Sequence, residues 1–186
     1  MNHIFVISGP SGVGKSTIAH AILEKYEGKM TYSISMTTRK IREGEVNGRE
    51  YIFTDIKNFE DLIKQDAFIE YAKVHDNYYG TLKSQINEVI NSGINILLDV
   101  DTRGAINIKQ QFGDKSVLIF IAPPSIDELK RRLFKRHTDS EEVIEKRIHN
   151  AIAEIEKSSK YDYIVKNNDL DQAISECINI IENHNK

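Results

Sequence analysis

The sequence has a single cysteine, no tryptophan and only three prolines among its 186 residues. Because Cys177 has no partner of its kind in the chain, no intrachain disulfide can form, which fits a reducing compartment. No apolar run approaches the length of a membrane span, and the N-terminus lacks a signal-peptide layout. The net charge of -3 gives no electrostatic basis for binding nucleic acid. We therefore expect a cytoplasmic protein without a membrane or nucleic-acid partner.

The composition is otherwise that of an ordinary globular domain. Hydrophobic residues make up 40% of the chain and charged residues 28%. The length suggests one domain that is large enough to bury a substantial core. No internal repeat, linker or low-complexity segment interrupts it.

The strongest motif lies near the N-terminus, where the pattern G-x-x-x-x-G-K-[ST] is matched in full. With the threonine that follows, its residues are Gly9, Pro10, Ser11, Gly12, Val13, Gly14, Lys15, Ser16 and Thr17. A buried strand is predicted over residues 4–8 and a helix over residues 16–26, so the motif has the flanking elements of a phosphate-binding loop. The alternative, a glycine-rich turn that precedes a helix by chance, is disfavoured by these neighbours.

The residue types in this loop are those that ATP binding requires. Glycines let successive backbone N–H groups curve inward, and the N-terminus of the helix adds a partial positive charge. The result is a concave cradle for phosphate oxygens. Lys15 would place its ammonium against the β- and γ-phosphates, and Ser16 would offer its hydroxyl to Mg²⁺.

The remaining elements alternate in a way that predicts an α/β fold with a three-layer core and a parallel sheet. Further strands are predicted over residues 32–36, 51–54, 68–74, 94–100, 116–121 and 161–165. Further helices are predicted around residues 59–63 and over 82–91, 102–111, 125–136, 140–159 and 169–183. Between about residues 32 and 80 short strands lie close together with one short helix, which indicates a small mixed α+β insertion. An insertion beside a phosphate loop is a natural place to hold a second substrate.

Several segments beyond the loop give the chain its resemblance to a known family. They are Tyr32 to Arg39, Arg42 to Gly48, Tyr51, Phe68 to Tyr71 and Asn77 to Thr81. Together with the loop they resemble guanylate kinase, and the similarity covers essentially the whole chain. The resemblance implies a core of residues 1–31, 94–124 and 160–186, a GMP-binding insertion over about 32–93 and a helical lid over about 125–159. It also implies that ATP and GMP are converted to ADP and GDP with Mg²⁺, by a monomer or a homodimer.

The resemblance assigns four residues to the phosphate of GMP. Arg39 and Arg42 would grip it, because a guanidinium is a fixed fork of donors that stays charged at any working pH. Tyr51 and Tyr79 would add hydroxyl donors. Without the resemblance, the arginines would fit a solvated basic loop and the tyrosines would fit core aromatics.

By the same resemblance, Glu70 reads the base. A carboxylate accepts from the N1–H and N2–H₂ groups of guanine, and adenine presents no such pair of donors. Ser35 and Thr81 would add hydroxyls around the base. AMP would leave the carboxylate unpaired, which should discriminate against it by a factor on the order of 10⁴. Taken alone, Glu70 would fit the exposed face of an edge strand.

An apolar strand ends in two acids, Asp99 and Asp101, which strand periodicity places on the same side. Ligands of open α/β sheets gather at the carboxyl ends of strands. Asp99 is therefore expected near the loop, where it would hold Mg²⁺ through water or contact GMP. For Asp101, capping of the next helix by Asp101 or Thr102 is an equally good interpretation.

The predicted lid carries Arg136 and Arg147, which by resemblance close over the transferring phosphoryl group. Phosphoryl transfer spreads negative charge over the equatorial oxygens, so mobile arginines stabilise its transition state. Lys15, Arg42, Arg136 and Arg147 are thus the expected catalytic residues. His137 and Ile41 depart from the usual family residues, glycine and proline, without removing a charge. On the adenine side, Asn167 or Asn168 would face the ring, with a loop cap as the alternative.

An ATP-dependent GMP kinase is the leading hypothesis. A non-catalytic guanylate-kinase-like interaction module is the first alternative, although the intact loop and the full set of arginines argue against it. A related sugar-phosphate kinase is the second, and it would have no use for Glu70. A signalling GTPase is disfavoured because no Asn-Lys-x-Asp signature occurs.

Overall fold

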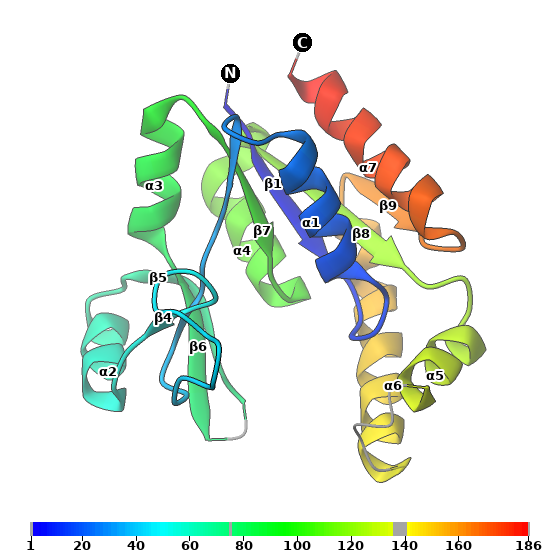
Figure 1. Cartoon of the computed structure of the whole chain (residues 1–186), viewed down its shortest axis with the longest axis horizontal. Helices are drawn as coiled ribbons and strands as arrows, with labels where there is room; N and C mark the ends of the chain where they lie inside the picture. The colour runs from blue at the N-terminus through cyan, green and yellow to red at the C-terminus, as the bar shows by residue number, and fades with distance from the viewer. Residues whose placement is uncertain (1, 75, 136–140, 186) are drawn as a thin grey trace.

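A computed structural model describes residues 2–74, 76–135 and 141–185. Its centre is a five-stranded sheet in the order β2-β7-β1-β8-β9, with every pair parallel. The strands are β2 (Met30–Tyr32), β7 (Asn95–Asp99), β1 (Ile4–Ser8), β8 (Ser116–Ala122) and β9 (Tyr163–Lys166). The predicted α/β fold with a parallel sheet is confirmed (Figure 1).

Helices cover both faces of this sheet, which explains why its central strands are apolar along their whole length. On β1, Phe5 and Ile7 face one layer while Ile4 and Val6 face the other, as the period of two requires. The first layer contains α1 (Lys15–Lys25) and α7 (Leu170–His184). The second contains α3 (Lys83–Ser92) and α4 (Thr102–Phe112).

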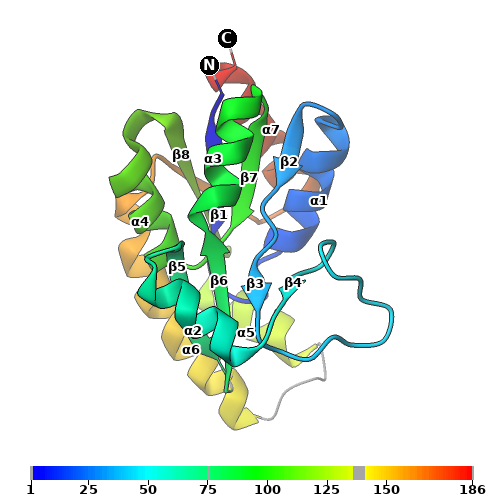
Figure 2. The same cartoon turned by 90° about the vertical axis from the view of Figure 1, so that its left-hand side faces the viewer.

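A second, smaller sheet lies beside the core in the order β4-β3-β6-β5 (Figure 2). Its strands are β3 (Met36–Thr37), β4 (Ile52–Phe53), β5 (Phe68–Val74) and β6 (Asn77–Leu82), and the helix α2 (Ile56–Lys64) packs against them. Phe59 of α2 is fully buried and stacks on Phe68, with ring centroids 4.3 Å apart. This sheet therefore has a hydrophobic cluster of its own, separate from that of the parallel sheet.

The predicted strand over residues 32–36 is wrong. The chain ends β2 at Tyr32 and begins β3 at Met36, so this stretch leaves the parallel sheet and enters the second one. An uninterrupted run of strand-forming residues does not reveal such a change of partner, because each short strand is satisfied by a different neighbour.

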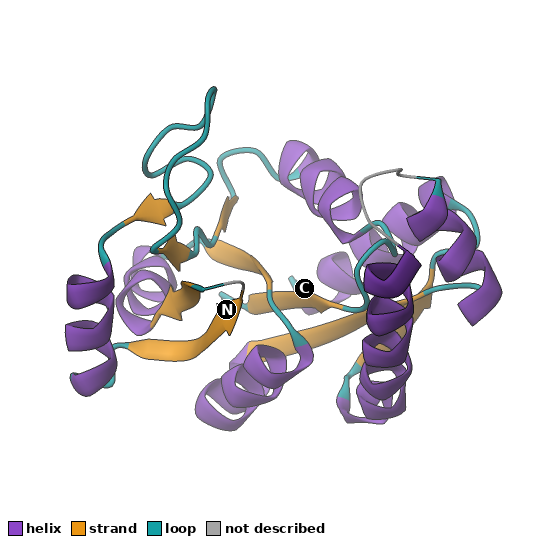
Figure 3. Cartoon of the chain, turned by 90° about the horizontal axis from the view of Figure 1, so that it is seen from below, coloured by secondary structure: helices purple, strands orange, loops and turns teal. Residues whose placement is uncertain are grey.

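Two helices, α5 (Ile126–Phe134) and α6 (Glu141–Glu156), pack on each other across from the second sheet (Figure 3). The helix predicted over 140–159 ends earlier than expected, because the 3₁₀ turn η2 (Lys157–Lys160) follows Glu156. A similar turn, η1 (Gly113–Lys115), joins α4 to β8. Within the described ranges, no helix is long and apolar enough to cross a bilayer.

Candidate functional site

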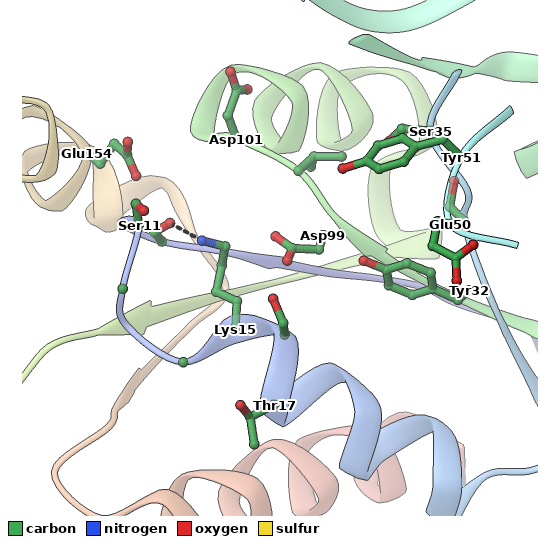
Figure 4. A pocket seen from close by; sticks show the side chains of 16 residues that line it. Ser11, Lys15, Thr17, Tyr32, Ser35, Glu50, Tyr51, Asp99, Asp101 and Glu154 are labelled. Atoms are coloured by element: carbon green, nitrogen blue, oxygen red, sulfur yellow. Dashed lines mark hydrogen bonds between the residues drawn. The ribbon is translucent and has the colours of Figure 1, made fainter. Parts of the chain in front are cut away.

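A cavity of about 550 Å³ opens at the carboxyl ends of β1 and β7 (Figure 4). One side is the glycine-rich loop with the start of α1, and the other is formed by residues at and beside the second sheet. Its lining residues are Gly9, Ser11, Gly12, Gly14, Lys15, Ser16, Thr17, Tyr32, Ser33, Ser35, Glu50, Tyr51, Asp99, Val100, Asp101 and Glu154.

The loop has a backbone that only glycine accommodates at two points. Gly9 has φ 143°, and a Cβ there would lie 2.3 Å from the Ile121 carbonyl oxygen. Gly14 has φ 103°, and its Cβ would lie 2.6 Å from Nδ2 of Asn167. Because α1 begins at Lys15, the N–H groups of its first turn have no partner within the helix. These groups and the helix dipole make the loop suited to an anion.

Lys15 extends over this loop and is held by it. Its Nζ donates to the carbonyl oxygen of Gly9 at 2.7 Å and to that of Pro10 at 3.4 Å. Asp99 lies across the cavity, at the end of the strand next to β1. Burial raises the pKa of the Asp99 carboxyl, and the nearby Lys15 ammonium pulls that pKa back down.

Asp101 resolves the alternative left open by the sequence, because it caps α4. Its Oδ1 accepts from the backbone N–H of Gly104 at 2.8 Å, while Thr102 is the first residue of the helix. Asp101 is also at the margin of the cavity, so the cap fixes a carboxylate beside Asp99.

Besides Asp99, two of the predicted GMP-binding residues, Ser35 and Tyr51, line the cavity directly. The ring of Tyr51 contacts that of Tyr79, with centroids 5.9 Å apart. Arg39 lies over the Tyr51 ring at 5.4 Å and forms a bidentate ion pair with Glu45, at 2.7 and 3.0 Å. Arg42 is exposed on the same loop, and its backbone N–H also donates to Glu45.

A half-buried carboxylate, Glu70, is paired with a buried hydroxyl, Thr81, on the two neighbouring strands β5 and β6. Thr81, only 1% exposed, donates its hydroxyl to Oε1 of Glu70 at 2.8 Å. The strand β5 is an edge strand, as the alternative reading supposed, but Glu70 turns toward α4 rather than to open solvent. Burial raises the pKa of Glu70, and the charge of Asp101 adds to the increase.

The α5 and α6 helices contact the loop from the other side. Arg147 donates from Nη1 to the Ser11 hydroxyl at 2.9 Å. The Asn167 side chain donates to the Val13 carbonyl at 2.7 Å, and Arg132 donates to the Asn167 carbonyl at 3.1 Å. The expected residues Arg136 and His137 lie outside the described residues.

About half of the predicted site residues line this one cavity. Pro10 and Val13 of the loop are not in its lining, and Arg147 and Asn167 contact the loop from outside it. Arg39, Arg42, Glu70, Tyr79 and Thr81 lie beyond its immediate lining. They belong to the loop and strands of the second sheet, and Ser35 and Tyr51, which directly precede β3 and β4, do reach the cavity.

Sequence reasoning assigned no role to Tyr32, Glu50, Arg132 or Glu154. Glu154 follows Arg147 by seven residues, a spacing of two helical turns, and this signal places both on one face of α6. Tyr32 lies at the carboxyl end of its strand, the same position rule that indicated Asp99. For Glu50 the sequence offers no comparable signal.

The fold and the loop together define a class: this is an α/β protein with a phosphate-binding loop between the first strand and the first helix of a parallel sheet. The family model for guanylate kinase matches residues 1–184. A guanylate kinase of Francisella tularensis subsp. tularensis is 46% identical over 97% of this chain and 96% of its own length. One of Mycoplasma genitalium is 47% identical over 96% of this chain and 74% of its own.

Solved structures give the same result. The crystal structure of guanylate kinase from Anaplasma phagocytophilum superposes with a TM-score of 0.77 at 32% identity, over 98% of this chain and 86% of that one. The chain therefore belongs to the guanylate kinase family.

Proposed function

We propose that this protein transfers the γ-phosphoryl group of ATP to GMP, giving ADP and GDP. The observation that carries the proposal is a single cavity with a phosphate-binding loop on one side and polar side chains of a second sheet on the other. Two anionic substrates can then meet within one cavity. A phosphate oxygen of GMP attacks the γ-phosphorus while the bond to the β,γ-bridging oxygen breaks, and ADP leaves.

On the ATP side, the loop amides and the start of α1 would hold the β- and γ-phosphates. Lys15 needs only to leave the Gly9 carbonyl to reach them. Ser11, Ser16 and Thr17 line the same wall and offer hydroxyls.

A divalent metal fits the residues present, and we propose Mg²⁺. The Ser16 hydroxyl and the Asp99 carboxylate both line the cavity, and both are hard oxygen donors. Bound there, the metal would neutralise charge on the transferring phosphates. Asp99 must be ionised for this role. Burial raises its pKa and opposes ionisation, whereas the charge of the Lys15 ammonium beside it favours the charged form.

On the acceptor side, Arg39 and Arg42 would hold the GMP phosphate, with Tyr51 and Tyr79 as hydroxyl donors. Glu45 supports this proposal, because it binds the guanidinium of Arg39 and the backbone of Arg42 and so fixes the loop between them. The guanidinium of Arg39 is thereby oriented before a substrate arrives, which lowers the entropy cost of binding.

Glu70 would read the guanine base, with Thr81 and Ser35 completing the hydroxyl set. The hydrogen bond from Thr81 fixes one carboxylate oxygen and leaves the remaining lone pairs for the base. The carboxylate must be charged to accept two donors, so binding of GMP to a half-buried Glu70 also offsets its loss of hydration.

We propose that α5 and α6 form a lid that closes with Arg136 and Arg147 over the transferring group. The hydrogen bond from Arg147 to the Ser11 hydroxyl of the loop supports this proposal. Closure would exclude water and so suppress hydrolysis of ATP. No general base is required, since a phosphate monoester is mostly dianionic near neutral pH.

A coupled assay for ADP tests the reaction. With Mg²⁺ and ATP, ADP should form only when GMP is added, and Glu70→Gln should lower the ratio of GMP to AMP turnover. Equal turnover of GMP, AMP and CMP would reject the proposal, and so would failure to bind ATP, which would favour the interaction module.

An active enzyme would supply GDP to purine nucleotide metabolism. We propose that the protein is located in the cytoplasm, where its substrates are found.

A further inference from the structure

The side chain of Asn167 is buried against the phosphate-binding loop, not turned toward a site for adenine. It is 4% exposed, and its Nδ2 donates to the Val13 carbonyl oxygen at 2.7 Å. The same nitrogen lies 2.6 Å from where a Cβ on Gly14 would be. The amide therefore fills the space that the missing side chain of Gly14 leaves, and it contacts the loop at two successive residues.

The backbone of Asn167 is held from two other directions. Its N–H donates to the Ala122 carbonyl of β8 at 2.9 Å. Its carbonyl accepts from Nη2 of Arg132 at 3.1 Å, and Arg132 is itself bound to Glu128 at 2.9 Å. Asn167 is thus tied to the central sheet and to α5 while its side chain supports the loop.

This arrangement matters for phosphate binding because the loop binds through its amides. A carbonyl that accepts a buried hydrogen bond is fixed in direction, and the peptide plane it belongs to carries the N–H of the next residue. The Val13 carbonyl belongs to the same peptide as the N–H of Gly14, so the Asn167 bond sets the direction in which that N–H points.

We infer that Asn167 is a positioning residue for the phosphate-binding loop, acting on the triphosphate of the donor nucleotide through the Val13–Gly14 peptide and not on its base. This inference rests on the proposal that the loop binds the phosphates of ATP. It replaces the expectation that the side chain contacts the adenine ring.

The test compares ATP with tripolyphosphate, which has the phosphates and no base. Dissociation constants for both are measured by calorimetry with Mg²⁺, so that the readout does not depend on turnover. Asn167→Ala should weaken both ligands by the same factor, about tenfold for the loss of one buried hydrogen bond. Asn167→Asp keeps the side-chain volume but sets oxygen against oxygen at Val13, and it should weaken both at least as much.

Asn179→Ala on the exposed surface of α7 is the matched control and should leave both constants unchanged. The KM for GMP should stay the same in all variants, because a general loss of structure would raise it too. Loss of ATP affinity with unchanged tripolyphosphate affinity would overturn the inference in favour of a base contact. Unchanged affinity for both would leave Asn167 only a packing role. If the wild type binds ATP but not tripolyphosphate, the inference is overturned, because the loop then does not bind phosphates without the nucleoside. If the wild type fails to bind ATP, the proposed function itself is rejected, and the two failures are thereby separated.

Discussion

Arg39 and Arg42 are on one loop but are held differently. Arg39 is locked by Glu45 and two aromatic rings, whereas the side chain of Arg42 extends into solvent. If Arg42 grips the GMP phosphate, Arg42→Ala removes a charge-assisted contact worth about 2 kcal/mol, or roughly thirtyfold in the KM for GMP. Steady-state kinetics should show this with an unchanged KM for ATP. Lys40→Ala, also exposed on this loop, is the control, and an equal loss for both substrates would contradict the assignment.

Glu70 should make the protein less stable as its carboxyl ionises. Burial raises its pKa above the ordinary 4.5, so the folded state binds the proton more tightly than the unfolded state does. The stability from this group is fully present below pH 4.5 and is lost as the pH rises through the higher folded-state value. Glu70→Gln keeps the acceptor for Thr81, so its free energy of unfolding should exceed that of the wild type at neutral pH.

Urea denaturation at several pH values checks this expectation. The difference between the two proteins should shrink as the pH falls toward 4.5. A difference that stays constant with pH would show that the charge of Glu70 is not the cause.

At the scale of single residues, the sequence indicated which residues lie at the cavity better than it indicated which side chains contact one another. Most of the loop residues, and Asp99, lie at one cavity, because a motif or the end of a strand fixes their position, and their roles in binding remain predictions. The Asn167–Val13 bond joins positions 154 residues apart, and no local pattern encodes such a pair. The assignments of Arg39, Arg42, Glu70 and Thr81 to GMP remain predictions.

At the scale of elements, α4 sets how closely Glu70 can approach the core. A Cβ on Gly104 would lie 2.7 Å from Cγ of Glu70 and 3.1 Å from Cβ of Val100. Gly104→Ala should therefore displace Glu70, raise the KM for GMP several-fold and reduce the preference for GMP over AMP. Because alanine favours a helix by about 1 kcal/mol over glycine, thermal stability should change little.

Kinetic assays of Gly104→Ala with GMP and AMP, beside a thermal melt, separate the two effects. Gln110→Ala, exposed on the same helix, should leave selectivity unchanged. An unaltered KM for GMP in Gly104→Ala would mean that the position of Glu70 is not critical.

Most helices and strands were predicted from periodicity because each buries one face or both against a continuous layer. The stretch from Tyr32 to Met36 was not, since it serves two sheets in turn. The end of β2 and the start of β3 are set by pairing with different neighbouring strands, and local residue preferences do not indicate such pairing.

At the scale of the molecule, the parallel sheet and its helices form one cooperative core, and Cys177 reports on it. The thiol is fully buried on α7, and burial raises its pKa to about 12. It should react with Ellman's reagent only through global unfolding, at least about 10³-fold more slowly than in denaturant. Rapid labelling in native buffer would show that α7 opens by itself. The Cys177→Ala variant gives the background rate.

Lys15 has hydrogen-bond partners within its own loop. Its ammonium donates a hydrogen bond to the Gly9 carbonyl, so the charge has an oxygen partner without a bound nucleotide. If Lys15 binds the triphosphate as proposed, the ligand replaces one oxygen partner of the ammonium by another, and the gain is only the difference between a neutral carbonyl and a charged phosphate. Release of ADP would then be easier for the same reason, because the lysine can return to the carbonyl of its own loop.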